Sequence, residues 1–386
     1  MRMVFRGSAI SNERGAGEST PRRFLPALGC AAVLLAQCSG TPGPAVRDYA
    51  PDAKLQAAGM APDKLRAAVD YVMDPAMSTK GLVVLRKGQV MVEAYENTDA
   101  RQNKHTSYSV AKSFTSALVG IAIGEGLLQL DDPVCRYYEA WDCADAADSR
   151  SRITIRHLLT LTSGLNWHED WSCPMTKFRL AFRNSDAVYM DLALTNTPPD
   201  YVLNREGKHE PGESFSYSTG DPALLSRIIE KVSGMTHFEY ARQKIFEPLN
   251  IQDVSWDSDA DGHTRSYARL HMRTRDYAKL GRLYAQNGIW NGVQIVPAAW
   301  VRESTDPANG PGAWYAYLWH ANLAEKFNRP ETTIPPDAFM ARGIFGQWVA
   351  VVPSLDLVVA KNANDQCALD EALFLEKIVA AVAVER

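Results

Sequence analysis

A serine and a lysine three residues apart are the first candidates for chemistry in this sequence. Ser109 and Lys112 lie in the segment HTSYSVAKSFTS at 105–116, ahead of the apolar run ALVGIAIGEGLLQL. The apolar spacing after Val110 predicts a helix with Ser109 in its first turn, which places Lys112 on the same face. A serine becomes nucleophilic beside a base, and a partly desolvated lysine amine can be that base. The helix amino terminus favours the negative charge that develops there.

One Ser-x-x-Lys motif is weak evidence by itself, because a chain of this length contains about one by chance. The alternative interpretation is a helix-capping serine followed by a solvated lysine. Three further segments follow in chain order: ITIRHLLTLTSGL at 153–165, PGESFSYSTGD at 211–221 and FEPLNIQDVSW at 246–256.

With these segments the chain resembles the serine β-lactamase-related hydrolases, which include class C β-lactamases, DD-peptidases, family VIII esterases and aminohexanoate-oligomer hydrolases. The resemblance covers roughly residues 60–380 and is greatest for the aminohexanoate-oligomer branch. Two segments carry that closer likeness: HMRTRDYAKLGRLYAQNGIWNGVQIVPAAWV at 271–301 and ARGIFGQ at 341–347.

The resemblance implies a role for each residue of the first two motifs. Ser109 would be the nucleophile that forms an acyl-enzyme, and Lys112 would be its proton partner. Tyr217 would be a second base that passes the proton to the leaving group, because a phenol near an ammonium loses its proton more easily. Class C enzymes have Asn where this chain has Thr219. Thr219 can still bind substrate by a hydrogen bond, with less reach than an amide.

The third motif of the family departs from its usual form. Aligned on its glycine, it reads Ala341-Arg342-Gly343 and lacks the usual cation at its first position. Strand alternation predicts that Arg342 turns away from the face shared by Ala341 and Gly343. The usual anchor for a β-lactam carboxylate is then missing, which disfavours a dedicated β-lactamase. Gly343 would let substrate backbone approach closely. By the same alignment, the backbone amides of Ser109 and Ile344 would form the oxyanion hole.

Acidic and aromatic residues after the SGL turn are further candidates for the rim of the site. Asp170 and Trp171 are expected to contact substrate, together with Trp167 and Glu169, although a solvated loop explains the same residues. The stretch 308–336, rich in Gly and Pro, is expected to lie over the site.

The elements that must position these residues predict an α/β protein with a β-lactamase/transpeptidase-like fold. Hairpin patterns occur near both ends of the chain, and a helix is expected at 61–73. Pairing of the terminal strands would give an antiparallel sheet flanked by helices, with a helical lobe inserted. The expected parts are a signal segment and tether at 1–45, an α/β lobe at 60–108 and 266–386, and a helical lobe at 109–265. No strand is expected in the Pro/Gly-rich tether, which extends over 41–51.

The amino-terminal segment predicts export. An apolar run at 24–37 follows Arg22 and Arg23 and is shorter than the ~20 residues that span a bilayer. Its end, LAQC, resembles a bacterial lipobox in which Cys38 is lipidated. We expect a periplasmic protein whose only membrane contact is this lipid anchor. The alternative is plain cleavage and release.

Four cysteines remain after Cys38, and none forms a C-x-x-C pair. Zinc and thioredoxin-like functions therefore find no support. In an oxidising compartment Cys135 can pair with Cys143, and Cys173 with Cys367. Four free buried thiols are the alternative.

The composition and the missing motifs exclude other classes. A net charge of −4 without a basic stripe argues against nucleic acid as a partner. No G-x-S-x-G elbow occurs, and His168-Glu169 is not followed by a second His at metalloprotease spacing. The sequence thus predicts a serine hydrolase without metal or organic cofactor. Small esters or linear amides are its first expected substrates, D-amino-acid wall peptides the second and β-lactams the third. A cell-envelope binding module or penicillin sensor is the non-enzymatic alternative.

Overall fold

The computed structural model describes residues 43–169, 198–310 and 312–382, which belong to one compact unit beginning at Pro42. Cys38 and the predicted signal segment lie outside the described residues. Within the described part of the chain, no helix combines the length and the apolar character needed to cross a membrane.

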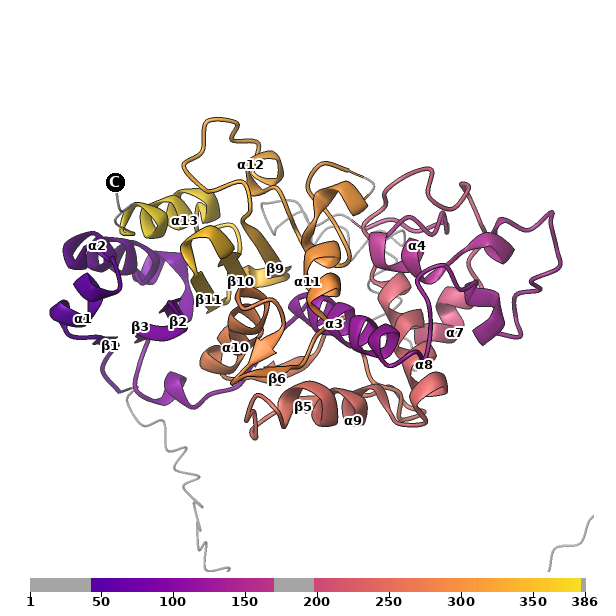
Figure 1. Ribbon diagram of the computed structural model, residues 1–386, viewed down its shortest axis with the longest axis horizontal. Helices are drawn as coiled ribbons and strands as arrows, with labels where there is room; N and C mark the ends of the chain where they lie inside the picture. Colours follow the sequence, from indigo (N-terminus) through magenta and orange to yellow (C-terminus); the bar gives the residue numbers. More distant parts are fainter. Residues whose placement is uncertain (1–42, 170–197, 311, 383–386) are drawn as a thin grey trace, which may run out of the picture. The chain divides into compact units, whose positions relative to one another are not determined.

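A six-stranded antiparallel sheet is built from both ends of this unit (Figure 1). Its strands are, in spatial order, β1 (Val46–Tyr49), β3 (Gln89–Tyr95), β2 (Thr79–Arg86), β11 (Leu357–Ala363), β10 (Gln347–Val352) and β9 (Phe339–Gly343). The join between the two ends is the β2–β11 pair, in which Val84 lies opposite Val359. Both predicted hairpins are present, and the expected antiparallel sheet is confirmed.

Strand β1 corrects the expectation of an unstructured tether over 41–51. Val46 pairs with Tyr95, and Tyr49 with Val92, so that β1 forms the edge of the sheet. The segment has no hydrophobic alternation that predicts a strand. It is ordered because the free edge of β3 offers hydrogen-bond partners to its backbone, a contact between distant residues.

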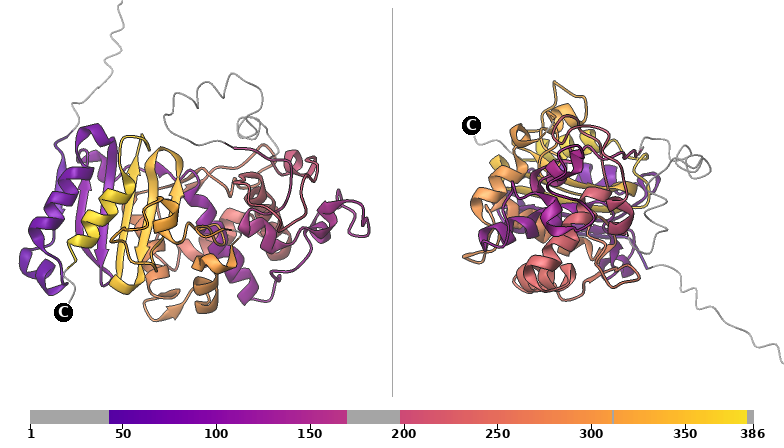
Figure 2. Two further views of the ribbon diagram at one scale, coloured as in Figure 1. Left: turned by 90° about the horizontal axis from the view of Figure 1, so that it is seen from above. Right: turned by 90° about the vertical axis from the view of Figure 1, so that its right-hand side faces the viewer.

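Helices cover both faces of the sheet (Figure 2, left). On one face, α2 (Pro62–Val72) and α13 (Glu371–Ala380) pack their apolar side chains on the strands, with α1 (Asp52–Ala57) beside them. On the other face, α10 (Thr274–Ala285) packs on β10 and β11. Because both faces are covered, β11 is buried along its whole length.

Helix α3 (Val110–Gly124) joins the sheet to the helical part of the unit. It packs against β9 on one side and against α8 and α11 on others, which explains why its residues from Val110 to Ala122 are buried all round. The other helices are α4 (Ile155–Thr160), α7 (Pro198–Leu203), α8 (Gly220–Ser233), α9 (His237–Ala241), α11 (Ala298–Thr305) and α12 (Leu323–Lys326). Short strands are β4 (His105–Thr106), β5 (Ser255–Trp256), β6 (Leu270–Met272), β7 (Ile289–Trp290) and β8 (Val293–Gln294). The exact boundaries of the two expected lobes stay a prediction.

A disulfide joins Cys135 and Cys143, as one of the two predicted pairings requires. It closes a short loop ahead of α4. Cys173 lies outside the described residues, so the second pairing stays a prediction.

Candidate active site

Ser109 and Lys112 meet at the amino end of α3. Ser109 is the residue just before the helix, and the backbone reaches it through Tyr108, whose φ of 44° turns the chain sharply after β4. The Nζ atom of Lys112 lies 2.9 Å from the Oγ atom of Ser109. This is the contact that a lysine base needs in order to take a proton from the serine.

Lys112 is buried, and its surroundings favour the neutral amine more than water does. Burial lowers the pKa of Lys112 to about 8, while the carboxylate of Glu169 opposes that shift. Two further acceptors hold the Nζ atom, the hydroxyl of Thr219 at 3.3 Å and the carbonyl of Tyr267 at 3.2 Å. The amine is therefore fixed in position whichever protonation state it adopts.

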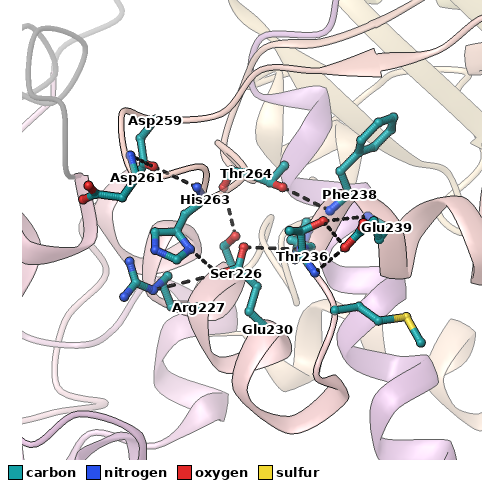
Figure 3. A network of polar contacts seen from close by, with 12 residues as sticks. Ser226, Arg227, Glu230, Thr236, Phe238, Glu239, Asp259, Asp261, His263 and Thr264 are labelled. Atoms are coloured by element: carbon teal, nitrogen blue, oxygen red, sulfur yellow. Dashed lines mark hydrogen bonds and ion pairs between the residues drawn. The ribbon is translucent and has the colours of Figure 1, made fainter.

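The loop that supplies the Tyr267 carbonyl is tied to α8 by polar contacts (Figure 3). The Nδ1 atom of His263 lies 2.6 Å from the carboxylate of Glu230, and the hydroxyl of Ser226 donates to the carbonyl of Thr264 at 2.9 Å. Glu230 and Ser226 both belong to α8. Because α8 also packs against α3, this network positions one acceptor of Lys112.

Tyr217 lies just before α8 and faces the same amine. The Nζ atom of Lys112 is 5.3 Å from the centre of the Tyr217 ring, and the ring packs edge-on against Tyr315. The structure thus brings together the three residues Ser109, Lys112 and Tyr217 that the sequence predicts. Their catalytic roles stay predictions.

Thr219 connects Lys112 to a carboxylate that the sequence analysis did not place in the catalytic machinery. The hydroxyl of Thr219 donates to Glu169 Oε2 at 3.0 Å, and its backbone N–H donates to Oε1 at 2.7 Å. Glu169 therefore faces the site from behind Thr219. The only sequence signal was an acidic residue after the SGL turn, because no local pattern links positions fifty residues apart. Asp170 and Trp171 lie outside the described residues.

The buried carboxyl group of Asp221 holds the start of α8. Asp221 accepts hydrogen bonds from the hydroxyls of Ser163 at 2.9 Å and Ser218 at 3.2 Å. Burial raises the pKa of Asp221 to about 7, although these hydrogen bonds oppose the shift. The SGL turn and the Tyr-Ser-Thr segment are thereby joined through one side chain.

Gly343, at the end of β9, touches the backbone of the nucleophile turn. A Cβ atom at this position would lie 2.4 Å from the carbonyl oxygen of Ser107 and 3.0 Å from the amide nitrogen of Ser109. Only glycine therefore allows this approach. The amides of Ser109 and Ile344 donate no backbone hydrogen bond within the described residues, and both residues line the same cavity. This arrangement suits the predicted oxyanion hole.

The turn after Gly343 is held from three sides. The buried amine of Lys361 donates to the carbonyl of Gly346 at 3.0 Å. The side chain of Gln347 donates to the carbonyl of Phe345 at 3.1 Å, and the amide of Phe345 donates to Gln366 Oε1 at 3.1 Å. The amide of Ile344 at the start of this turn is thereby kept in place.

Ser109, Tyr217, Gly343 and Ile344 open into one cavity of about 260 Å³. Aromatic side chains, among them Tyr108, Tyr267 and Trp314, form part of its walls, and polar side chains form the rest. A cavity of this size and lining suits a small organic substrate with a few polar contacts.

Arg342 leaves the face of the sheet that Ala341 occupies, as strand alternation predicts, since its side chain reaches Glu371 at the start of α13. The expectation that this turn keeps Arg342 out of the site is wrong. Arg342 is one of the residues that line the cavity. Its Nε atom donates to Glu371 at 2.8 Å; Glu371 raises the pKa of the guanidinium most, and Tyr217 adds a smaller contribution. β9 is the outer strand of the sheet at this side and ends at the next residue, so that no neighbouring strand covers the long side chain.

Among residues 43–169, 198–310 and 312–382, no group of three or more His, Cys, Asp or Glu side chains suits a metal ion.

The antiparallel sheet flanked by helices, with the Ser-x-x-Lys helix beside it, is the β-lactamase/transpeptidase-like fold. The chain belongs to the Beta-lactamase family, whose sequence model matches residues 65–382. Members of this family are hydrolytic enzymes of esterase and amidase type.

Individual relatives agree with this assignment. The 6-aminohexanoate-dimer hydrolase of Paenarthrobacter ureafaciens is 24% identical over 299 residues, which are 74% of this chain and 72% of the relative. The solved structure of EstCE1, a hydrolase with promiscuous acyltransferase activity, has a TM-score of 0.64 at 17% identity and covers 84% of this chain and 98% of its own. The solved structure of a family VIII carboxylesterase has a TM-score of 0.63 at 16% identity, and the match covers 83% of this chain and 97% of the carboxylesterase. At these identities the two structures show the fold alone.

Proposed function

We propose that this protein is a serine hydrolase that forms an acyl-enzyme on Ser109 and hydrolyses small esters or linear amides. One observation carries the proposal: Ser109 lines a cavity of about 260 Å³, and its hydroxyl lies 2.9 Å from the buried amine of Lys112. A serine that merely caps a helix needs neither the amine nor the cavity.

In the proposed reaction, the Oγ atom of Ser109 attacks the carbonyl carbon while its proton passes to the neutral amine of Lys112. The carbonyl oxygen becomes an oxyanion that the amides of Ser109 and Ile344 stabilise. Tyr217 gives a proton to the leaving oxygen or nitrogen as its bond to the carbonyl carbon breaks, and it takes the proton that Lys112 received from Ser109, so that the amine is neutral again. A water molecule then attacks the carbonyl carbon of the acyl-enzyme and gives a proton to the same Lys112–Tyr217 pair. The bond between this carbon and the Oγ atom of Ser109 breaks, the Oγ atom takes that proton back, and the acid leaves.

The names of the relatives support the substrate class. One relative is a dimer hydrolase and one structural neighbour is a carboxylesterase. Position 341, the first of the third motif, is Ala and not the usual cation, which supports ranking β-lactams below esters and amides as expected substrates.

The test is intact-mass spectrometry after exposure to p-nitrophenyl acetate, a short p-nitroanilide and penicillin G, with release of the chromophore recorded. We expect turnover of the ester or the anilide by the wild type and loss of turnover and of every adduct in Ser109→Ala. Ser116→Ala is the matched control, because Ser116 is buried on the same helix and does not line the cavity. A stable penicillin adduct without turnover of any substrate contradicts the proposal and favours a sensor.

Export and lipidation form a separate part of the proposal. The apolar run ahead of Cys38 and the disulfide between Cys135 and Cys143 support an oxidising compartment outside the cytoplasm. In a bacterial host, globomycin should make the precursor accumulate, and Cys38→Ala should abolish fatty-acid labelling. Normal processing in the presence of globomycin would instead indicate plain cleavage.

A further inference from the structure

The two amides of the proposed oxyanion hole come from two different turns of the chain. Ser109 ends the turn between β4 and α3, and Ile344 lies in the turn between β9 and β10. An oxyanion hole needs both N–H groups at hydrogen-bond distance from the same developing oxygen. The position of one turn relative to the other therefore decides whether the hole is formed.

Each of these turns contains an aromatic residue with a positive φ beside the amide. Tyr108, directly before Ser109, has a φ of 44°, and Phe345, directly after Ile344, has a φ of 63°. Residues with a Cβ atom seldom adopt this region, because the Cβ atom comes too close to the backbone. Such strain persists only where the surrounding structure enforces it, and it gathers at functional sites.

Hydrogen bonds hold each turn from its own side. In the first turn, the carbonyl of Tyr108 accepts from the hydroxyl of Ser107 at 2.8 Å. In the second turn, the amide of Phe345 donates to Gln366 at 3.1 Å, and its carbonyl accepts from Gln347 at 3.1 Å. These bonds fix the shape of each turn, but they do not join one turn to the other.

The side chains of Tyr108 and Phe345 make that connection. Their ring centres lie 5.0 Å apart, within the range of separations that aromatic pairs favour. The other contact between the turns is the close approach of Gly343 to the backbone of Ser107 and Ser109. The glycine sets how near the two turns can come, and the attraction between the rings resists their separation.

The ring pair also adjoins two hollows in the structure. Tyr108 lines the cavity that contains Ser109, and together with Phe345 it lines a second hollow of about 240 Å³. Both side chains are half-buried. Because the second hollow adjoins the pair, loss of either ring leaves the two turns room to move.

We propose that Tyr108 and Phe345 are positioning residues of the oxyanion hole, and that the contact between their rings keeps the amides of Ser109 and Ile344 directed at the same oxygen. The inference rests on the proposed function and adds two residues to its machinery. Neither ring transfers a proton or forms a bond to the substrate. The pair acts on the transition state through the backbone to which each ring is attached.

The test compares p-nitrophenyl acetate with its thiono analogue, O-(4-nitrophenyl) thioacetate, in which sulfur replaces the carbonyl oxygen. Sulfur is larger than oxygen and a weaker hydrogen-bond acceptor, so a formed oxyanion hole favours the oxygen ester. The measured quantity is the ratio of the two kcat/KM values, oxygen ester over thiono ester. Changes in the nucleophile, in the leaving group or in the folded fraction act on both esters and cancel in this ratio.

We expect the ratio to fall about tenfold or more in Phe345→Leu, a part of the loss that removal of an oxyanion donor causes. Leucine keeps a Cβ atom and an apolar side chain at the positive φ, so only the ring is lost. Phe238→Leu is the matched control, because it removes a half-buried ring of α9 that packs on Phe246 at 6.1 Å between centres. This control should keep the wild-type ratio.

Tyr108 provides the second half of the test. Tyr108→Leu should lower the ratio by a similar factor, whereas Tyr108→Phe keeps the ring and should keep the ratio. The double variant Tyr108→Leu/Phe345→Leu should lose no more than either single variant, because one substitution already removes the contact. Thermal unfolding of each variant shows that it is folded, and the two single variants are independent, so that either one can serve as the test.

Two results overturn the inference while the Ser109 hydrolase stands. One is a wild-type ratio in a folded Phe345→Leu or Tyr108→Leu protein. The other is a double variant in which the two losses multiply, because the rings then act separately. If the wild type does not hydrolyse p-nitrophenyl acetate through Ser109, the proposed function fails, and the inference fails with it.

Discussion

Lys112 and Glu169 are linked through one hydroxyl group, that of Thr219. The hydroxyl donates to Glu169 at 3.0 Å, so its oxygen is free to accept from Lys112 at 3.3 Å. The carboxylate therefore stabilises the charged lysine from behind Thr219, while Lys112 keeps its short contact with Ser109. In class C enzymes the family resemblance places an Asn at the position of Thr219; here a threonine and a carboxylate occupy that side of the lysine.

This relationship predicts the pH profile of the enzyme. If Lys112 acts as a base, kcat/KM should rise as the pH passes about 8, because the neutral amine becomes the main form there. Glu169 raises the pKa of Lys112, so Glu169→Gln should move this rise to lower pH. The measurement is kcat/KM for an ester between pH 5 and 10 on both proteins. Glu210→Gln, an exposed acid paired with Arg152, is the control for loss of one negative charge. An unmoved profile in Glu169→Gln contradicts the role of Glu169.

Tyr217→Phe should lower turnover by ~10²-fold or more, because general acid–base groups contribute on that scale. The ring and its packing on Tyr315 are kept, so the fold should be retained. Steady-state turnover of an amide and an ester measures the effect, with Tyr71→Phe on α2 as the control. Wild-type turnover in Tyr217→Phe would assign the proton transfer to another group.

Gly343→Ala should abolish most of the activity without unfolding the protein. The added Cβ meets backbone atoms of Ser107 and Ser109, which cannot move aside as a flexible side chain can. The displaced Ser109 amide should cost about 10²- to 10³-fold in kcat, as loss of one oxyanion donor does. Gly312→Ala is the control, because a Cβ there meets no atom within 4 Å. Turnover and thermal unfolding should be measured together; an active Gly343→Ala enzyme would exclude the proposed oxyanion hole.

Asp221 should make the stability of the protein depend on pH. Its pKa is about 7 in the folded chain against an ordinary value of 3.8, so between these pH values the folded state binds more protons than the unfolded state. The free energy of unfolding therefore falls as the pH rises through this window, by on the order of 4 kcal/mol in total. Asp221→Asn keeps an acceptor for Ser163 and Ser218 and lacks this titration.

Urea unfolding of the wild type and Asp221→Asn at pH 4, 5, 6 and 7 measures this effect. The stability of the wild type relative to the variant should decline steadily over the series. A constant difference would mean that Asp221 is ionised throughout.

Local patterns in the sequence predicted the elements that local physics controls. Apolar spacing located α2 and α3, and alternation located both hairpins. The spacing of Ser109 and Lys112 predicted their contact, because residues three apart share a helix face. The short separation of Cys135 and Cys143 likewise allowed their disulfide. In each case the interacting groups are close in the chain, so a few residues contain the necessary information.

Other features of the fold and the site depend on contacts between segments that are distant in the chain, and only the tertiary structure shows them. Val46–Tyr49 became a strand because β3 offered an edge, and Arg342 reached the cavity because β9 ends at an uncovered side of the sheet. Glu169 came to the site from a loop and Lys326 from the short helix α12, and no periodicity predicts the course of either segment. The sequence thus determined the family, the contact between Ser109 and Lys112 and the secondary structure around this pair. The electrostatic surroundings of the nucleophile were decided by folding, because charge interactions depend on distance in space and not along the chain.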